Sequence, residues 1–379
     1  MTYADTAAAL PVHPQVLSRM SAAHAVYGNP SSTHEPGQQA AALLAEARAS
    51  IAAALGCRAS EVVLTSGGTE ADNLAVKGIV LASTRGRHLI TTPIEHEAVR
   101  ASADYLRRLH GVEVTELPLR PDGTVSPDAL PAALRPDTAL VSVQHASNEI
   151  GTVQPLVDLA AVARQAGVPF HTDAVQTAGW MEVGLGVLGV DAISVSGHKI
   201  GAPKGVGALV LRGGIPIEPL VHGGGQQRGR RSGTEDVAAA VALATALELA
   251  AGMRALAPAM ANVRDRLIDG IRTRVPGSLL TGARTDRLPN HASFCFPGIA
   301  GEAVLLELER RGVVCSSGSA CAAGRDEPSA VLLALGIPAE VAQTAVRFTL
   351  AADADTALAD RIVDLTVDAV AAVGALSPR

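Results

Sequence analysis

The sequence is poor in aromatic residues and in cysteine. Only 2% of its residues are Phe, Trp or Tyr while 48% are hydrophobic, so alanine, valine and leucine must fill most of the core. Four cysteines in 379 residues are too few for a disulfide framework, and they show neither a CxxC pair nor a zinc-binding spacing with histidine. Any functional cysteine is therefore expected to act as a free thiol, and no resident metal is expected.

An excess of positive charge is also missing. The formal net charge of −6 gives no general attraction to nucleic acids or anionic membranes. The N-terminal stretch "MTYADTAAALPVHPQ" lacks the basic and apolar regions of a signal peptide. The longest apolar tract, "VAAAVALATALELAAGM", contains Thr and Glu and is interpreted as a core helix too short to span a bilayer. We therefore expect a cytoplasmic protein that contacts neither nucleic acid nor membrane directly.

The hydrophobic pattern indicates an α/β protein. Between about residues 40 and 250, short apolar strands alternate with helix-period segments, as in "EVVLTSGGTEADNLAVKGIVLA". Repeated strand–loop–helix units predict a mostly parallel sheet sandwiched by helices. Beyond about residue 252 the pattern changes to a smaller α+β unit that includes "HASFCFPG" and "GEAVLLELERRG". We predict a large domain over residues 14–252 and a small domain built from residues 1–13 and 253–379.

Polar motifs follow several of the predicted strands, where ligands of such sheets bind. In "TSGGTEADN", Gly68 and Thr69 open a helix, so backbone N–H groups there could hold an anion. An ordinary turn and helix cap would have the same sequence. The chain has neither a GxxxxGK[ST] loop nor a GxGxxG motif, so the usual signals of nucleotide binding are missing.

Two further residues at strand ends carry ionisable groups. Asp173, directly after an apolar strand, could pair with a protonated ring nitrogen or cap a helix. Lys199 is one of only three lysines in the chain, and an amine beside a buried strand is costly unless it is paired or reactive. Pyridoxal phosphate is typically bound by three groups: a lysine that forms a Schiff base, an acid that pairs with the pyridinium nitrogen, and an anion-binding site for the phosphate.

Three more side chains are candidates for chemistry. His96 in "PIEHEAV" could stack on a flat cofactor or move protons, although a histidine there is also compatible with an ordinary structural role. Cys321 lies among small residues in "CSSGSACAAGRDEPS" and is the best candidate for a reactive thiol. Arg347 on an apolar strand favours a carboxylate ligand such as an amino acid. The other cysteines are interpreted as structural: Cys57, Cys295 and Cys315.

In combination these motifs resemble one family. The sequence is similar to the cysteine desulfurases of the NifS/IscS type, within the class V aminotransferase branch of fold-type I pyridoxal-phosphate enzymes. The resemblance runs from "YADTAAALPVHPQV" to "AVRFTLA" and includes "GNPSSTH", "TSGGTEADN", "EHEAV", "SNEIGTVQP", "HTDAVQ", "SGHKI", "GGGQQRGRRSGTED" and "SSGSAC". It implies the fold of that transferase class, with a large sheet domain and a smaller domain that carries the cysteine loop.

The resemblance also implies a role for each matching residue. Lys199 would hold pyridoxal 5′-phosphate covalently, Asp173 would pair with its ring nitrogen, and His96 would stack on the ring and transfer protons. Cys321 would be the nucleophile. Further contacts to the cofactor's phosphate or 3′-oxygen are implied for Gly68, Thr69, Gln176, Ser196 and His198. Substrate carboxylate binding is implied for Asn148 and Arg347, and a phosphate contact across an obligatory homodimer for Thr234 of the partner subunit.

The implied reaction converts L-cysteine to L-alanine and leaves a persulfide on Cys321. The sulfur then passes to an acceptor protein, for iron–sulfur cluster assembly or for thio-modification of tRNA or cofactors. Cys321 could also ligate an iron–sulfur cluster transiently. Two alternatives stay open: a selenocysteine lyase or other C–S lyase of the same fold, and a non-catalytic sulfur-carrier docking protein.

The sequence departs from the family pattern at a few places. Its N-terminal "ADTAAA" has Thr6 where the family commonly has asparagine, so no role is assigned to that segment. "SGGTE" and "RFTLA" are small changes that keep Thr69 and Arg347. The segment after Arg347 is short, which leaves the sulfur acceptor open. Lys204 is assigned no catalytic role.

Overall fold

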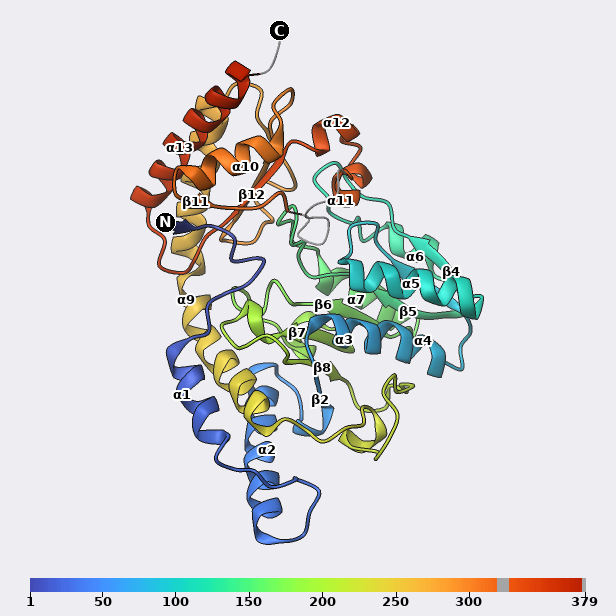
Figure 1. Cartoon of the computed structure of the whole chain (residues 1–379). Coiled ribbons are helices and arrows are strands. Elements are labelled where there is room, and N and C mark those ends of the chain that lie inside the picture. Colours follow the sequence, from blue (N-terminus) through green and yellow to red (C-terminus); the bar gives the residue numbers. More distant parts are fainter. Residues whose placement is uncertain (319–326, 377–379) are drawn as a thin grey trace.

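The computed structural model describes residues 1–318 and 327–376. Its centre is a seven-stranded sheet of order β2-β8-β7-β6-β5-β3-β4 (Figure 1). The strands are β2 (Val62–Thr65), β3 (His88–Thr91), β4 (Glu113–Glu116), β5 (Thr138–Ser142), β6 (Phe170–Asp173), β7 (Ala192–Ser196) and β8 (Gly207–Leu211). Strands β4, β3, β5, β6 and β7 run parallel, and β8 is antiparallel to both β7 and β2. The predicted α/β fold with a mostly parallel sheet is confirmed.

Helices cover both faces of this sheet because its strands alternate apolar side chains between two cores. Leu89 of β3 packs with one face and the next residue, Ile90, with the other. The first face is covered by α3 (Gly68–Asn73), a π-helical turn (Leu74–Gly78), α4 (Ile79–Ala82) and α5 (Glu97–His110). The second is covered by α1 (Pro14–Ala23), α2 (Glu35–Ala54), α6 (Ala129–Ala133), α7 (Leu156–Gln165), α8 (Leu185–Leu188) and the first half of α9 (Val237–Arg274).

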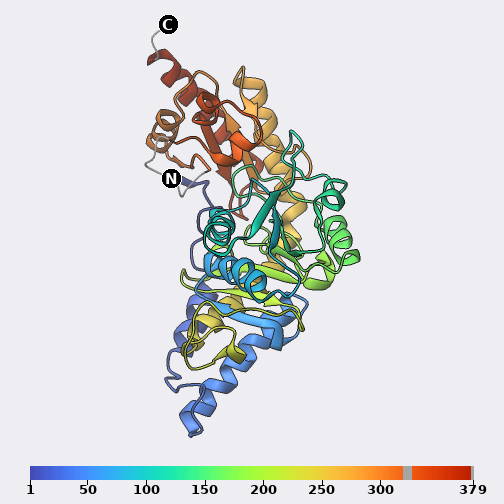
Figure 2. The same ribbon diagram turned by 90° about the vertical axis from the view of Figure 1, so that its right-hand side faces the viewer.

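A second group of elements forms its own core at one end of the molecule (Figures 1 and 2). Its antiparallel sheet has the order β12-β10-β9. The elements of this core are β9 (Leu279–Leu280), β10 (His291–Cys295), α10 (Gly301–Arg310), β11 (Val313–Val314), β12 (Ala345–Thr349) and α13 (Thr356–Leu376). Between β11 and β12, α11 (Ala330–Ala334) and α12 (Ala339–Ala342) pack in a small separate cluster with Ile94 and Ile150. The N-terminal β1 (Thr2–Tyr3) pairs in parallel with β11, so the start of the chain belongs to this group.

Helix α9 differs from the expectation. The apolar tract and the following charged segment form one continuous helix that passes through Gly252 and Pro258. By length and composition alone α9 could cross a membrane, so the expectation that the tract is too short was wrong. However, 56% of its most apolar window is buried within the protein, where α1, α2 and α13 pack against it. Helix α9 is a core helix, and the division near residue 252 stays a prediction.

Candidate active site

Predicted site residues gather at the carboxyl ends of the central parallel strands. Asp173 is the last residue of β6, and Lys199 lies in a 3-10 turn (Gly197–Lys199) directly after the neighbouring strand β7. His96 follows β3 and caps the start of α5, where its Nδ1 accepts a hydrogen bond from Ala98 N at 3.1 Å. One side-chain donor atom each of His96, Asp173 and Asp72 lies within 4.8 Å of the others. The topology therefore brings an amine, an imidazole and a buried acid to one edge of the sheet.

The amine of Lys199 contacts the N-terminal segment. Its Nζ donates hydrogen bonds to the carbonyl oxygens of Ala7 and, at 2.8 Å, of Ala8. Gln176 Nε2 also donates to the Ala7 oxygen, at 3.1 Å. The "ADTAAA" segment, to which the sequence analysis assigned no role, is therefore part of the site. This segment contributes through its backbone carbonyl groups. Every residue has such a group, so this contribution cannot be recognised from residue types.

Asp173 caps the turn that follows β6. Its Oδ1 accepts a hydrogen bond from Val175 N at 2.8 Å, which stabilises the turn after β6. The side chain is buried, and this burial raises its pKa while the neighbouring basic groups His96 and Lys199 oppose the shift. Asp173 is thus a turn-capping residue whose carboxyl group also faces two basic side chains.

The start of α3 packs closely against the end of β7. A Cβ added to Gly68 would lie 2.8 Å from Val175 Cγ2 and 3.3 Å from Ser196 Cβ, so only glycine fits without a shift. Gly67 has a φ of 152°, which side chains rarely adopt. Thr69 follows in the first turn and is exposed. The N–H groups of this first helical turn have no partners within the helix and lie beside Ser196, an arrangement suited to an anion.

Two polar side chains lie beside this helix start. Ser196 Oγ and His198 Nδ1 are 3.0 Å apart. Burial, together with the smaller effects of the charges of Lys199 and Lys204, lowers the pKa of His198 to about 4. His198 is therefore neutral near pH 7 and acts as a hydrogen-bonding group. Lys204 itself is exposed, and its electrostatic effect on His198 is the one link between this lysine and the site that the described residues show.

Arg347 lies buried on β12 and is held by three oxygen atoms. Its Nη1 donates to the carbonyl oxygens of Asn148 at 2.8 Å and Gly318 at 2.9 Å. Its Nη2 donates to Asp5 Oδ1 at 2.5 Å. The buried Nε has no hydrogen-bond partner among the described residues. The two predicted substrate-binding residues are thus adjacent, although Asn148 contacts Arg347 through its backbone, and the guanidinium keeps an N–H group for a further acceptor.

We predict that replacing Asp5 with asparagine destabilises the protein. The change leaves the guanidinium of Arg347 buried without its ionic partner, and the side chains of this pair are only 1% and 15% exposed. The loss in the free energy of unfolding should be about 2–4 kcal/mol, measured by urea denaturation. Asp104→Asn is the matched control, because Asp104 pairs with Arg107 on the exposed face of α5. It should cost less than about 1 kcal/mol, and equal losses for the two variants would contradict the prediction.

Two predicted residues are not joined to this group. Thr234 is exposed in the segment before α9, and within residues 1–318 and 327–376 no hydrogen bond links it to the other predicted residues. Its loop is fixed near the start of α3, where Arg231 Nε lies 2.8 Å from Glu70 Oε1. Cys321 lies outside the described residues.

The three described cysteines are poor nucleophiles. Burial raises the thiol pKa of Cys57 to about 12, of Cys295 to about 11 and of Cys315 to about 12. Thiols with such pKa values stay protonated near pH 7, whereas the thiolate is the reactive form. Their surroundings suit structural roles.

Two buried acids at the site were missed by the sequence analysis. Asp72 lies one turn into the helix that begins at Gly68, and Glu95 directly precedes His96. Both side chains are about 1% exposed. Acidic residues are mostly exposed in proteins, so a sequence pattern predicts them at the surface unless a contact with a distant segment buries them. The one signal for Asp72 was that it lies inside "TSGGTEADN", a motif already assigned to the site.

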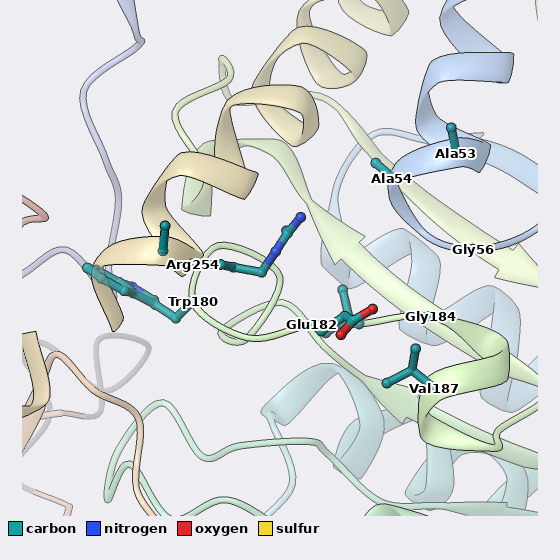
Figure 3. Close-up of a pocket in the computed structure, with 10 residues that line it drawn as sticks. Ala53, Ala54, Gly56, Trp180, Glu182, Gly184, Val187 and Arg254 are labelled. Carbon is teal, nitrogen blue, oxygen red and sulfur yellow. The ribbon is translucent and has the colours of Figure 1, made fainter. Parts of the chain in front are cut away.

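A separate cleft of about 570 Å³ lies between the end of α2, α9 and residues 180–187 (Figure 3). Figure 3 shows the side chains of Trp180 and Arg254 on one side and Glu182 and Val187 on the other. No predicted site residue of the described part of the chain lines it. Its size therefore does not identify it as the place of the chemistry indicated at the strand ends.

Comparison with known proteins gives consistent results. The family described as "Aminotransferase class-V" matches residues 2–361. The chain is 44% identical over 351 residues to a cysteine desulfurase IscS of Dictyoglomus turgidum, covering 92% of this chain and 89% of that protein. It is 45% identical over 371 residues to an IscS-like cysteine desulfurase of Mycobacterium tuberculosis, covering 94% of each.

Solved structures agree with these relatives. A NifS-like protein superposes with a TM-score of 0.90 at 35% identity, covering 98% of this chain and 99% of that one. SspA in complex with cysteine superposes with a TM-score of 0.79 at 32% identity, covering 92% of this chain and 99% of that one. The similarity therefore extends over nearly the whole chain in both sequence and fold.

Proposed function

We propose roles for the residues of this chain on one premise: the chain belongs to the class V aminotransferase family and, within it, to the cysteine desulfurases. Members of this family depend on pyridoxal phosphate. The observation that carries the assignment to this site is the position of the Lys199 amine, in the turn after β7, next to the buried carboxyl group of Asp173 on β6. An amine and an acid at adjacent strand ends suit the aldehyde and the ring nitrogen of this cofactor.

The residues present fit pyridoxal phosphate. The close packing at Gly68 leaves the N–H groups of the first turn of α3 available for the phosphate, with Thr69, Ser196 and His198 beside them. Gln176 and Lys199 share the Ala7 carbonyl as a hydrogen-bond acceptor, so both side chains are directed to the same place. When bound, the cofactor supplies an electrophilic aldehyde and a ring that takes up electron density from the Cα of an amino acid.

Each side chain then has a defined task. Lys199 would hold the cofactor through its aldehyde carbon, and its free amine would be positioned to move a proton at the substrate Cα. The hydrogen bond from Ala98 N occupies the lone pair of His96 Nδ1, so neutral His96 carries its proton on Nε2. His96 would cover the ring and present this N–H, the atom from which it would release a proton. Arg347, with its unpartnered Nε, would bind the substrate carboxylate beside Asn148.

Cys321 completes the reaction. Its thiolate would attack the sulfur of L-cysteine, forming the S–S bond as the Cβ–S bond breaks. The electron pair stays on the three-carbon fragment, which takes up protons and becomes L-alanine, while Cys321 holds a persulfide. The raised thiol pKa values of Cys57, Cys295 and Cys315 support this assignment, because they make these three thiols poor nucleophiles near pH 7.

Partners and location are the less direct part of the proposal. We propose a cytoplasmic homodimer in which Thr234 reaches the phosphate site of the partner subunit. Its exposed position, beside a loop that Arg231 fixes to Glu70, supports a contact outside its own chain. The persulfide would pass to an acceptor protein of iron–sulfur cluster assembly or of tRNA or cofactor thiolation.

The experiment is a stoichiometric assay with purified protein loaded with pyridoxal phosphate. L-Cysteine should yield one L-alanine for each sulfur recovered as persulfide or, after reduction, as sulfide. Pyruvate and ammonia in place of alanine would indicate a β-elimination lyase and contradict the proposal. Measurement with L-selenocysteine in parallel gives the preference between the two substrates.

A further inference from the structure

Two carboxyl groups lie together beneath the proposed ring-nitrogen site. Asp173 at the end of β6 and Asp72 in α3 are about 7% and 1% exposed. One carboxyl oxygen of each lies within 4.8 Å of the other. Two ionised carboxylates so close together in a buried place would repel each other, so one of the two keeps its proton. The pair therefore holds one proton and one negative charge.

The surroundings decide which acid carries the charge. Asp173 accepts the backbone N–H of Val175 and faces two basic side chains, His96 and Lys199. All of these favour its ionised form. The groups around Asp72 have the opposite effect, because its charged neighbours are two further acids, Asp173 and Glu95. Burial and these neighbours raise the pKa of Asp72 well above its usual range.

The nearest basic group to Asp72 does not offset this. His171 Nε2 lies 3.7 Å from Asp72 Oδ1 on the same buried face. However, His171 is enclosed between Ser142 Oγ and Ser194 Oγ, each at 2.9 Å from one of its ring nitrogens. Burial lowers the pKa of His171 to about 3, so the ring is neutral near pH 7. His171 therefore contributes a hydrogen-bonding group to the buried polar residues around Asp72, and no positive charge.

The register of the sheet brings these buried polar residues together. His171 and Asp173 are two residues apart on β6 and therefore point to the same face, towards α3. Ser194 on β7 lies opposite Asp173, and Ser142 on β5 lies opposite His171. Asp72 of α3 meets these residues at His171, whose Nε2 lies 3.7 Å from Asp72 Oδ1. The polar residues of three adjacent strands thus meet one acid from the helix, which fixes the orientation of Asp72 towards Asp173.

We propose that Asp72 is a positioning residue: it stays a neutral carboxylic acid and donates a hydrogen bond to Asp173, which becomes the single negative charge available to the cofactor's ring nitrogen. This inference rests on the proposed function, because it requires that Asp173 pairs with that nitrogen. A second ionised acid would place two negative charges opposite one protonated nitrogen. A missing donor would leave the Asp173 oxygen unsatisfied and free to turn away.

Two substitutions at one position separate these possibilities. Asp72→Asn keeps the shape, the neutrality and a hydrogen-bond donor, so the dissociation constant for pyridoxal phosphate should stay within about threefold of wild type. The visible absorption spectrum of the bound cofactor should also be unchanged. Asp72→Ala removes the donor and should weaken binding by about 10- to 100-fold and shift the spectrum. Equal weakening by both variants would mean that the charge of Asp72 is required, and would overturn the proposal.

An infrared measurement reads the proton directly. The spectrum of the wild-type holoenzyme minus that of Asp72→Asn should contain the carbonyl stretch of a protonated carboxylic acid. The stretches of an ionised carboxylate in that difference would overturn the proposal. Failure of the proposed function has a different signature: Asp173→Asn would then bind pyridoxal phosphate as tightly as wild type, instead of at least about tenfold more weakly. Both tests read binding and spectra and do not depend on turnover.

Discussion

Replacing Lys199 with alanine should abolish the covalent attachment of pyridoxal phosphate and reduce alanine formation from L-cysteine by at least about 10²–10⁴-fold. The loss has two causes. The amine that binds the aldehyde is removed, and so is the group positioned to move a proton at the substrate Cα. Reduction with borohydride followed by mass spectrometry should find the cofactor on Lys199 in wild type and on no residue in the variant.

Lys199→Arg distinguishes chemistry from charge. Arginine keeps the positive charge opposite Asp173 and can still donate to the carbonyl oxygens of the N-terminal segment, but it cannot lose its proton and attack an aldehyde. It should therefore be as inactive as the alanine variant. Lys204→Ala is the matched control, because this exposed lysine lies five positions further along the same loop and influences the site only through His198. Normal attachment in Lys199→Arg, or loss of attachment in Lys204→Ala, would contradict the assignment.

The sequence predicted those parts of the site that depend on one strand and the loop after it. Lys199 and Asp173 were found because each is chemically unusual at the end of an apolar run, and the parallel sheet brings such ends together. Asp5 could not be found in this way. Its partner Arg347 is 342 positions away, and only the packing of the N-terminal segment against β12 joins them.

The same reasoning applies to helix α9. A change in composition near residue 252 suggested a domain division there, and α9 continues through Gly252 and Pro258. Proline removes a helical hydrogen bond and glycine is a weak helix former, so local propensity favours a break there. The helix continues because its two halves pack against different cores, the central sheet on one side and the C-terminal group on the other. Burial of the two halves of α9 outweighs the low helix propensity of Gly252 and Pro258. This burial depends on contacts with distant segments, which a local sequence pattern does not show.

Replacing Cys321 with alanine should stop sulfur transfer while leaving the cofactor site intact. Under the proposed assignment Lys199, Asp173 and His96 hold the cofactor, so the absorption spectrum of the bound cofactor and its change on adding L-cysteine should be those of wild type. Alanine formation should fall by at least about 10³-fold, because the sulfur of L-cysteine has lost its attacking nucleophile. Persulfide on the protein, detected by alkylation and mass spectrometry, should disappear.

This variant also separates the three functions that the sequence left open. A desulfurase loses alanine and persulfide together. A selenocysteine lyase, in which Cys321 only assists, would still release selenide and alanine from L-selenocysteine at a substantial rate. A non-catalytic docking protein would show no spectral change with L-cysteine even as wild type. Cys315→Ala is the matched control, because burial raises the pKa of that thiol to about 12 and should keep it out of the reaction. If alanine formation survived in Cys321→Ala but was lost in Cys315→Ala, the nucleophile would be Cys315. That result would overturn the mechanism.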